Sequence, residues 1–351
     1  MSAAVISATS IICAAGFGAP QVWATVRSRV SRTSRSSVMD RDFEPIPMGL
    51  VPETALDPDD TDLDSLGWPA RARRMLRLSV PALRALDLSG DEDPVTLYLG
   101  LPELVAEDSP WIDEFSKHLC TRAGLTLDES SSQIFPHGRA STLLALESAL
   151  SALDNGSSQS LVVGGVDSLF DLRLLATLGA EGRVLGPRVM DGFIPGEGAA
   201  FLLLKSAQES EPDGAVIQSA ASTTDTGHRY GAEPARGEGL AEALQLLRGR
   251  LPSPIVPVAS TFAGFNGENF DAKLWGVAQL RHKDLFATKM TLEHPASCFG
   301  DTGAATGAIL AVVAVAALSA QHRQGPALIW AASDQTHRGC AVVQMPPQNQ
   351  V

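Results

Sequence analysis

Residues 138–168 read GRASTLLALESALSALDNGSSQSLVVGGVDS, and this stretch predicts a buried helix followed by a buried strand. The helix is expected over about residues 140–153, with the pair 155–156 (Asn-Gly) as its C-terminal cap, and the strand over residues 161–166. Glu147 is the charged side chain on an otherwise Ala-, Leu- and Ser-rich helix. Because nearly every face is apolar or small, we expect the helix to be covered nearly all round.

Residues 303–333 repeat this pattern as GAATGAILAVVAVAALSAQHRQGPALIWAAS, with a small-residue start, an uncharged helix, a polar loop and a strand. Two copies of one supersecondary unit indicate a duplicated α/β domain. Helices buried on all sides need a sheet on each side, which predicts a layered αβαβα fold. The polar, proline-bearing segment 206–214 is the expected linker between an N-terminal half, 1–205, and a C-terminal half, 215–351.

The composition narrows the classes of function. Of the 351 residues 44% are hydrophobic and 19% charged, which allows a large core and excludes wholesale disorder. The 27 Lys and Arg against 40 Asp and Glu give a net charge of −13, so we expect no nucleic-acid partner. The basic stretches 27–35 and 71–77 are interpreted as solvated helix and loop surface.

Neither a membrane nor a metal is expected as a partner. The apolar segment 1–15 lacks the basic residues that precede the core of a signal peptide, and segment 302–320 is too weakly apolar to span a bilayer. The four cysteines lie far apart with no CxxC spacing, which fits neither a disulfide framework nor a zinc site. We therefore expect a cytoplasmic protein with buried, reduced cysteines and no cofactor.

Several segments, in the right order, resemble the β-ketoacyl synthases of fatty-acid and polyketide assembly, which have the thiolase fold. MDGFIPGEGAAFLLLKS (190–206) resembles the family's aspartate-glycine-phenylalanine and glycine-glutamate-glycine segment. The family's first strand, turn and helix resemble ISATSIICAAG (6–16) and VWATVRSRV (22–30). The strand after its nucleophile helix resembles LVVGGVDS (161–168), and the segment before a second-half helix resembles GAEPARGEGLAEAL (231–244). The likeness covers nearly the whole chain.

The resemblance also shows where this chain departs from the family. The family's nucleophilic cysteine stands at the tip of the first buried helix, where the helix dipole and free amides favour a thiolate. Here that position holds Arg139, which stays protonated and cannot attack a thioester. The family's two histidines fall on Asp301 and on Ser260, or Thr261 with a slip of one residue.

Two further family features are replaced: the expected lysine is Ala296, and the gating loop reads SDQTHRG (333–339). The resemblance therefore implies a degenerate site with no catalytic residues. Arg139 and Asp301 would face each other across the old pocket, and we hypothesise a buried ion pair between them. The alternative is that one or both point to solvent or to other partners.

Weaker candidates each have a structural alternative. His137 could add a cation for an anionic ligand, His228 could touch a ligand at the pocket mouth, and Cys298 could be a reactive thiol. His337 with Cys340 could form a nucleophile pair. Packing and turn capping explain the same residues without a ligand.

The resulting expectation is a catalytically inactive ketosynthase-like protein acting as a partner subunit, scaffold or adaptor. Its setting would be fatty-acid or polyketide-type assembly, or a secretion-linked pathway. The family dimerises through a strand that we match to residues 161–166, so a homodimer or a heterodimer with an active ketosynthase is expected. A further possibility is a module that binds an acyl chain or an acyl carrier protein without turnover, whose docking would require the arginines of 71–77 or a similar basic patch.

The alternative is an acyltransferase or thioester hydrolase that uses the same pocket with altered residues. It would need a nucleophile, for which Ser141, Ser260 and Cys298 are the candidates, and none of them has a visible activating partner in the sequence.

Overall fold

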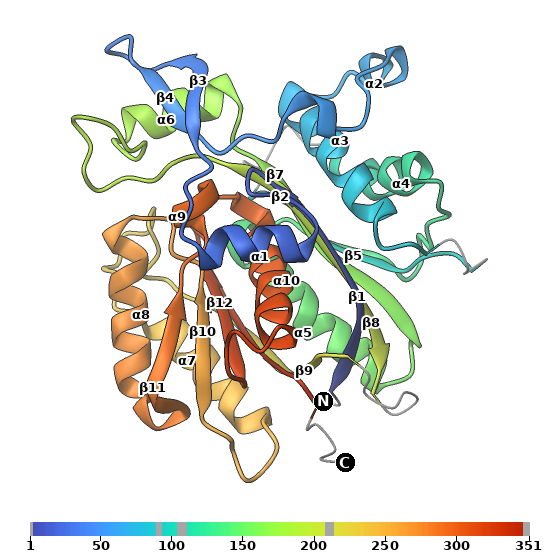
Figure 1. Ribbon diagram of the computed structural model, residues 1–351, viewed down its shortest axis with the longest axis vertical. Coiled ribbons are helices and arrows are strands. Elements are labelled where there is room, and N and C mark those ends of the chain that lie inside the picture. Colours follow the sequence, from blue (N-terminus) through green and yellow to red (C-terminus); the bar gives the residue numbers. More distant parts are fainter. Residues whose placement is uncertain (1–2, 89–92, 104–110, 208–213, 347–351) are drawn as a thin grey trace.

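The computed structural model describes residues 3–88, 93–103, 111–207 and 214–346 (Figure 1). Its helices are α1 (Ala19–Arg27), α2 (Thr61–Ser65), α3 (Ala70–Arg84), α4 (Trp111–Ala123), α5 (Ser141–Asp154), α6 (Leu172–Ala180), α7 (Glu238–Arg250), α8 (Asn269–Arg281), α9 (Ala296–Phe299) and α10 (Thr306–Ser319). Its strands are β1 (Ala4–Cys13), β2 (Gly16–Phe17), β3 (Ser34–Met39), β4 (Pro45–Met48), β5 (Leu97–Gly100), β6 (Gln133–Phe135), β7 (Ser160–Ser168), β8 (Glu197–Ser206), β9 (Val216–Thr224), β10 (Val258–Ala263), β11 (Phe286–Glu293), β12 (Ala327–Ala332) and β13 (His337–Gln344).

The large sheet consists of two arrays with the same topology. One array runs β6-β5-β7-β8-β1 and the other β11-β10-β12-β13-β9. In each array the first three strands are parallel to one another, and each of the last two strands is antiparallel to the strand before it. The arrays join where β1 pairs with β9 through Ala4↔Ile217 and Val5↔Val216. This matching order confirms the duplicated α/β fold predicted from the two repeated stretches.

The middle layer is formed by α5 and α10, the two helices expected to be buried. Each has 14 residues and follows a short 3-10 turn, Gly138–Ala140 before α5 and Gly303–Ala305 before α10. Both helices contact strands of both arrays, and they contact each other. Gly307 permits this close approach, because a Cβ there would lie 3.0 Å from the Cβ of Thr142.

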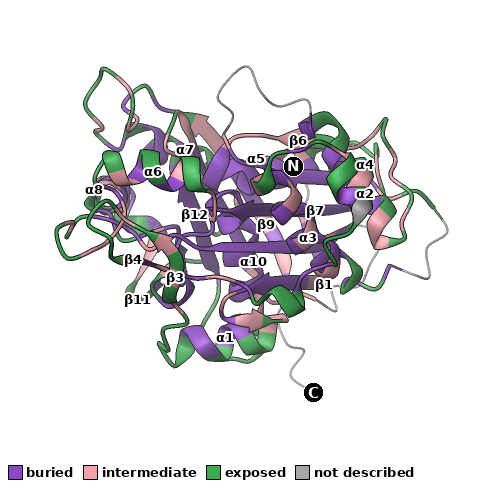
Figure 2. Ribbon diagram, turned by 90° about the horizontal axis from the view of Figure 1, so that it is seen from above, coloured by how far each residue is buried: buried purple, intermediate pink, exposed green. Residues whose placement is uncertain are grey.

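The outer layers complete the five-layer arrangement. Helices α3 and α4 cover the outer face of the first array, and α7 and α8 cover that of the second (Figure 1). Figure 2 shows central strands such as β7, β9 and β12, together with α10, as mainly buried, with exposed residues on the outward faces of the outer helices. The apolar stripe of each outer helix therefore packs on a sheet while its polar stripe meets solvent.

One strand differs from expectation in its place in the sheet. The strand expected at 161–166 as a subunit interface is β7, which pairs with β5 on one side and β8 on the other. An interior strand has no free hydrogen-bonding edge, so β7 cannot be the strand that joins two subunits.

Within the described ranges, every helix is too short or too polar to cross a lipid bilayer. The predicted linker, 206–214, lies between β8 and β9, and its residues 208–213 fall outside the described residues. The division into halves at that linker stays a prediction.

Candidate functional site

The two buried helices begin next to each other, and a charged pair lies at this meeting point. Arg139 lies in the turn before α5, and Asp301 lies five residues before α10. The Arg139 Nε donates to Asp301 Oδ2 at 2.8 Å and to Oδ1 at 3.1 Å, and Arg139 Nη2 also donates to Oδ2. The side chains are 8% and 1% exposed, so the hypothesised buried ion pair is confirmed.

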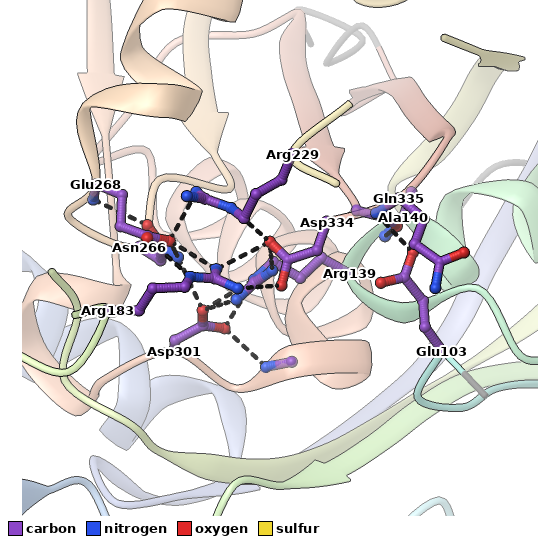
Figure 3. A network of polar contacts seen from close by, with 12 residues as sticks. Glu103, Arg139, Ala140, Arg183, Arg229, Asn266, Glu268, Asp301, Asp334 and Gln335 are labelled. Atoms are coloured by element: carbon purple, nitrogen blue, oxygen red, sulfur yellow. Dashed lines mark hydrogen bonds and ion pairs between the residues drawn. The ribbon is translucent and has the colours of Figure 1, made fainter. Parts of the chain in front are cut away.

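The pair belongs to a larger group, which we call the charged cluster: Arg139, Arg183, Arg229, Asn266, Glu268, Asp301 and Asp334 (Figure 3). Its members come from loops at the ends of strands and helices in both halves of the chain. Strand ends that are far apart in sequence meet at one edge of a layered fold, which brings these loops together.

Asp334 is the carboxylate that all three arginines share. Its Oδ1 lies 3.0 Å from Arg139 Nη1, accepts from Arg183 Nη2 at 2.9 Å, and accepts from Arg229 Nε at 3.2 Å. Asp334 follows β12, in the short loop 333–336 that leads to β13. A single loop residue thus ties the tip of the α5 turn to two other arginines.

Glu268 holds the opposite side of the cluster. Arg183 donates to both of its oxygens, Nε to Oε1 at 3.0 Å and Nη2 to Oε2 at 2.8 Å, in a bidentate arrangement. Asn266 Nδ2 bridges Glu268 Oε2 at 2.8 Å and Asp301 Oδ2 at 3.1 Å. Arg229 Nη2 also donates to Glu268, at 2.9 Å.

The cluster balances three guanidinium groups with three carboxylates. Burial raises the pKa of Asp334, but Arg139 and Arg183 outweigh it and hold that pKa well below its usual range. Burial lowers the pKa of Arg139, and Asp301 and Asp334 outweigh it and raise that pKa above the ordinary value. The aromatic ring of Phe193 makes cation–π contacts with two of the guanidinium groups. Its centroid lies 5.6 Å from the Cζ of Arg139 and 5.3 Å from the Cζ of Arg183. Each carboxylate of the cluster is thus paired with at least one guanidinium group.

Two acids beside the cluster have pKa values near neutrality. Burial raises the pKa of Glu103 to about 7, helped by Asp334, and raises that of Asp271 to about 7. Such values are typical of acid–base groups. Glu103 accepts from the backbone N–H of Gln335 at 3.1 Å, and no hydroxyl or thiol of the described residues donates to either acid.

The space beside Asp301 is too small for an acyl chain. The void that Asp301, Asn266, Phe299 and Leu310 line has a volume of about 10 Å³. A cavity of this size holds at most about one water molecule. Side chains of α10 and of the loop after β10 fill the remaining space.

Ser260, the position matched by spacing to a family histidine, lies outside the charged cluster, and that match stays a prediction. It sits on β10, where its hydroxyl donates to the Gln324 carbonyl at 2.7 Å and accepts from Thr291 at 3.0 Å. The residue from this segment that contacts Asp301 is Asn266. Ser141, buried at the start of α5, donates to the Ala304 carbonyl at 3.4 Å.

The two weak histidine candidates lie near the cluster but not in it. The rings of His137 and His337 stack with centroids 4.0 Å apart, and burial lowers the pKa of both, that of His337 to about 4. Neutral rings do not supply the cation suggested for His137. His228 precedes Arg229, and its Nδ1 is buried with no hydrogen-bond partner among the described residues.

The cysteine candidates are inert by position. Cys298 is buried in α9 with its sulfur 3.9 Å from the Ser297 hydroxyl, and burial raises its pKa. Cys340 is buried on β13 and its pKa is also raised by burial. His337 and Cys340 are three residues apart on that strand, so their side chains point to opposite faces. Among the residues that the structure describes, no group of His, Cys, Asp and Glu is placed to hold a metal ion.

The basic stretch 71–77 is neither a solvated surface nor a free docking patch. Arg74 donates to both oxygens of Glu197, at 2.6 and 2.7 Å, and Glu197 is fully buried. Arg71 pairs with Asp167 at 2.7 Å, and Arg77 with Glu53 at 3.0 Å. The stretch 27–35, in contrast, carries exposed arginines as expected.

Spacing alone did not identify Arg183, Arg229, Glu268 or Asp334 as a group. They lie in four separate loops, and a charged residue in a loop is ordinarily solvated. The available signal was the placement of Arg139 at the tip of an uncharged buried helix. That placement required acidic partners from elsewhere in the chain.

Comparison with known proteins agrees with the geometry. Residues 106–210 match the family model of the β-ketoacyl synthase N-terminal domain. No curated protein matches the sequence significantly. Among solved structures, the ketosynthase from module 6 of the bacillaene synthase from Bacillus subtilis 168 superposes with a TM-score of 0.79 at 15% identity, covering 98% of this chain and 72% of that one.

Two further solved structures cover almost the full length of both chains. The ishigamide ketosynthase/chain length factor has a TM-score of 0.72 at 18% identity, covering 98% of this chain and 99% of that one. A type II PKS acyl-carrier protein in complex with its ketosynthase has 0.71 at 16%, covering 98% and 100%. The chain therefore has the thiolase-like fold of the ketosynthases, and its residues 106–210 match the family model of the β-ketoacyl synthase N-terminal domain.

Proposed function

We propose that this chain is a catalytically inactive ketosynthase-like subunit that pairs with an active ketosynthase in polyketide-type assembly. The observation that carries the proposal is the Arg139–Asp301 pair at the meeting point of α5 and α10. A condensing enzyme needs a thiolate at that helix tip, and a guanidinium paired with a carboxylate cannot accept an acyl group.

The surroundings of the pair support the same proposal. The void beside Asp301, about 10 Å³, leaves no room for a growing chain. The chain's four cysteines are all buried. In this proposal the charged cluster fills the position of the substrate pocket. Its ion pairs hold together loops that in an active enzyme would surround the substrate.

The edge strand β6 is the surface that we propose for the partner. It pairs with β5 on one side, and its three residues are exposed or half-buried. An unpaired edge can extend the sheet into a second subunit. A neighbour titled as a ketosynthase/chain length factor supports a heterodimer, and the same edge would serve a homodimer that acts as a scaffold or adaptor.

Co-expression tests the subunit role. The chain is expressed with an affinity tag beside a cysteine-bearing ketosynthase of its source organism, and we expect the two to co-purify at one-to-one stoichiometry. The carbonyl of Phe135 accepts from Leu101 beside β5, so by alternation the N–H of Ile134 faces the free edge. Ile134→Pro removes this outward donor and should abolish pairing, whereas Ile134→Ala keeps the backbone and should preserve it. Light scattering of the chain alone measures self-association. A strict monomer that captures no ketosynthase contradicts the proposal.

Incubation with malonyl- and acyl-thioesters, followed by intact mass, tests inactivity. We expect no covalent adduct and no condensation product from the chain alone. The second candidate function, thioester hydrolysis, is favoured by Glu103, whose raised pKa of about 7 suits a general base. Release of free thiol from acyl-thioester that is lost in Glu103→Gln would establish that alternative and overturn the inactive subunit.

A further inference from the structure

A groove unrelated to the charged cluster lies on the side of the molecule where α1 crosses α10 (Figure 1). One face of α1, the C-terminal end of α10 and the edge of β1 enclose about 730 Å³. Its lining is mainly apolar and includes Ile11, Phe17, Trp23, Val315 and Ala316. This volume lies within the roughly 300–1,000 Å³ typical of small-molecule sites, which are apolar with a few convergent polar groups.

The polar groups gather at one wall, around His322. The buried indole of Trp23 donates from Nε1 to His322 Nδ1 at 3.0 Å. Arg27 Nη1 lies 2.6 Å from the other ring nitrogen, Nε2. Indole and guanidinium nitrogens are donors only, and a neutral imidazole accepts at one nitrogen and donates from the other.

The two contacts therefore conflict. Because Nδ1 accepts from Trp23, Nε2 carries the hydrogen and points it at the N–H of Arg27. If the exposed Arg27 side chain moves away from this 2.6 Å contact, an anionic oxygen can accept from both donors and remove the conflict. Arg27 has no acidic partner among the described residues, so its charge is available to such an oxygen.

Most of the groove is built from segments without acidic side chains. Residues 1–39 and 302–332 form three of its walls, and neither segment contains an Asp or Glu, although the chain has a net charge of −13. Arg323 stacks over Trp23 at 5.2 Å and pairs with Glu293 at 2.7 Å, outside these segments. A positive wall beside an apolar floor complements an amphipathic anion.

We propose that this groove binds a small amphipathic anion, a carboxylate or sulfonate carried on an apolar body. The head group accepts from Arg27 Nη1 and from His322 Nε2, and the body covers Trp23, Val315 and Ala316. The site shares no lining residue with the charged cluster, so its occupancy is independent of whether the chain pairs with a ketosynthase.

Two probes test the site: the fluorescent sulfonate 8-anilinonaphthalene-1-sulfonate and dodecanoate. We expect saturable dye fluorescence that dodecanoate displaces and that dodecanol, which lacks the charge, displaces far less. Arg27→Gln should weaken dodecanoate binding about tenfold through loss of a charged hydrogen bond, and Arg27→Lys should restore part of it. Arg248→Gln, an exposed arginine on α7, is the matched control and should leave binding unchanged.

A second variant separates this groove from other apolar surfaces. Ala24 is exposed on the groove face of α1, so Ala24→Trp should fill the groove and abolish displacement with an unchanged melting temperature. A photoactivatable dodecanoate should label residues of α1 or the C-terminal end of α10. Absent displacement, full binding by Arg27→Gln or Ala24→Trp, or labelling confined to another surface overturns the proposal.

Discussion

The guanidinium of Arg139 and the carboxylate of Asp301 meet where two buried helices begin, 162 residues apart in the chain. Asp301 also accepts from the backbone N–H of Gly303 at 2.8 Å, within the turn that precedes α10. A carboxylate at the start of a helix is favoured by the helix dipole, and a cation there is disfavoured. The acidic partner therefore offsets the unfavourable placement of the basic one.

Arg139→Ala is expected to destabilise the protein by roughly 3–5 kcal/mol, because it leaves the Asp301 carboxylate buried and without its main counter-charge. Chemical denaturation measures the loss. Replacing both partners, Arg139→Leu with Asp301→Leu, should recover much of it, since no buried charge then remains unpaired. An unchanged unfolding midpoint in the single variant would show that the pair does not stabilise the fold.

The arginines of α3 should separate into buried and exposed classes. Arg74→Met leaves the fully buried Glu197 carboxylate without its counter-charge and is expected to lower the free energy of unfolding by roughly 3–5 kcal/mol. Arg73→Met removes an ion pair to Asp64, which is largely exposed, and should change stability by at most about 0.5 kcal/mol. Thermal melts of the two variants provide the comparison; equal losses would argue against the structural role of Arg74.

The thiols should resist modification until the protein unfolds. Burial raises the pKa of Cys13 and Cys120 from 9.0 to about 12, which lowers their thiolate fraction about a thousandfold. Burial also raises the pKa of Cys298 and Cys340. Ellman's reagent should label all four rapidly in denaturant and none rapidly in buffer. Fast native labelling of Cys298 would reinstate it as a reactive thiol.

Stability should fall as the pH rises from about 4.5 toward 7 because of Glu103. Burial raises its pKa from 4.5 to about 7, so in this window the folded protein retains a proton that the unfolded chain has released. The free energy of unfolding then decreases with pH, by up to about 3 kcal/mol for this group. Glu103→Gln should therefore raise the melting temperature relative to the parent at pH 8 but not at pH 4.5. An equal shift at both values would exclude titration as the cause.

The sequence alone predicted the parts of the fold that rest on local pattern. The two uncharged helices, their small-residue starts and the strands that follow them are all present, because a helix apolar on every face has no stable place except between two sheets. The pairing of Arg139 with Asp301 followed from the resemblance to the β-ketoacyl synthases, which implies that the two positions face each other across one pocket, and from the need of a buried guanidinium for a nearby carboxylate.

Other features depended on contacts between distant loops. Arg183, Glu268 and Asp334 join one cluster only because the ends of several strands converge, and no spacing in the sequence encodes that convergence. Strand order decided that β7 is interior and β6 is an edge. Local periodicity thus determined which segments are buried, whereas the identity of the groups that meet in the buried site was decided by tertiary packing, because ion pairs form between neighbours in space and not along the chain.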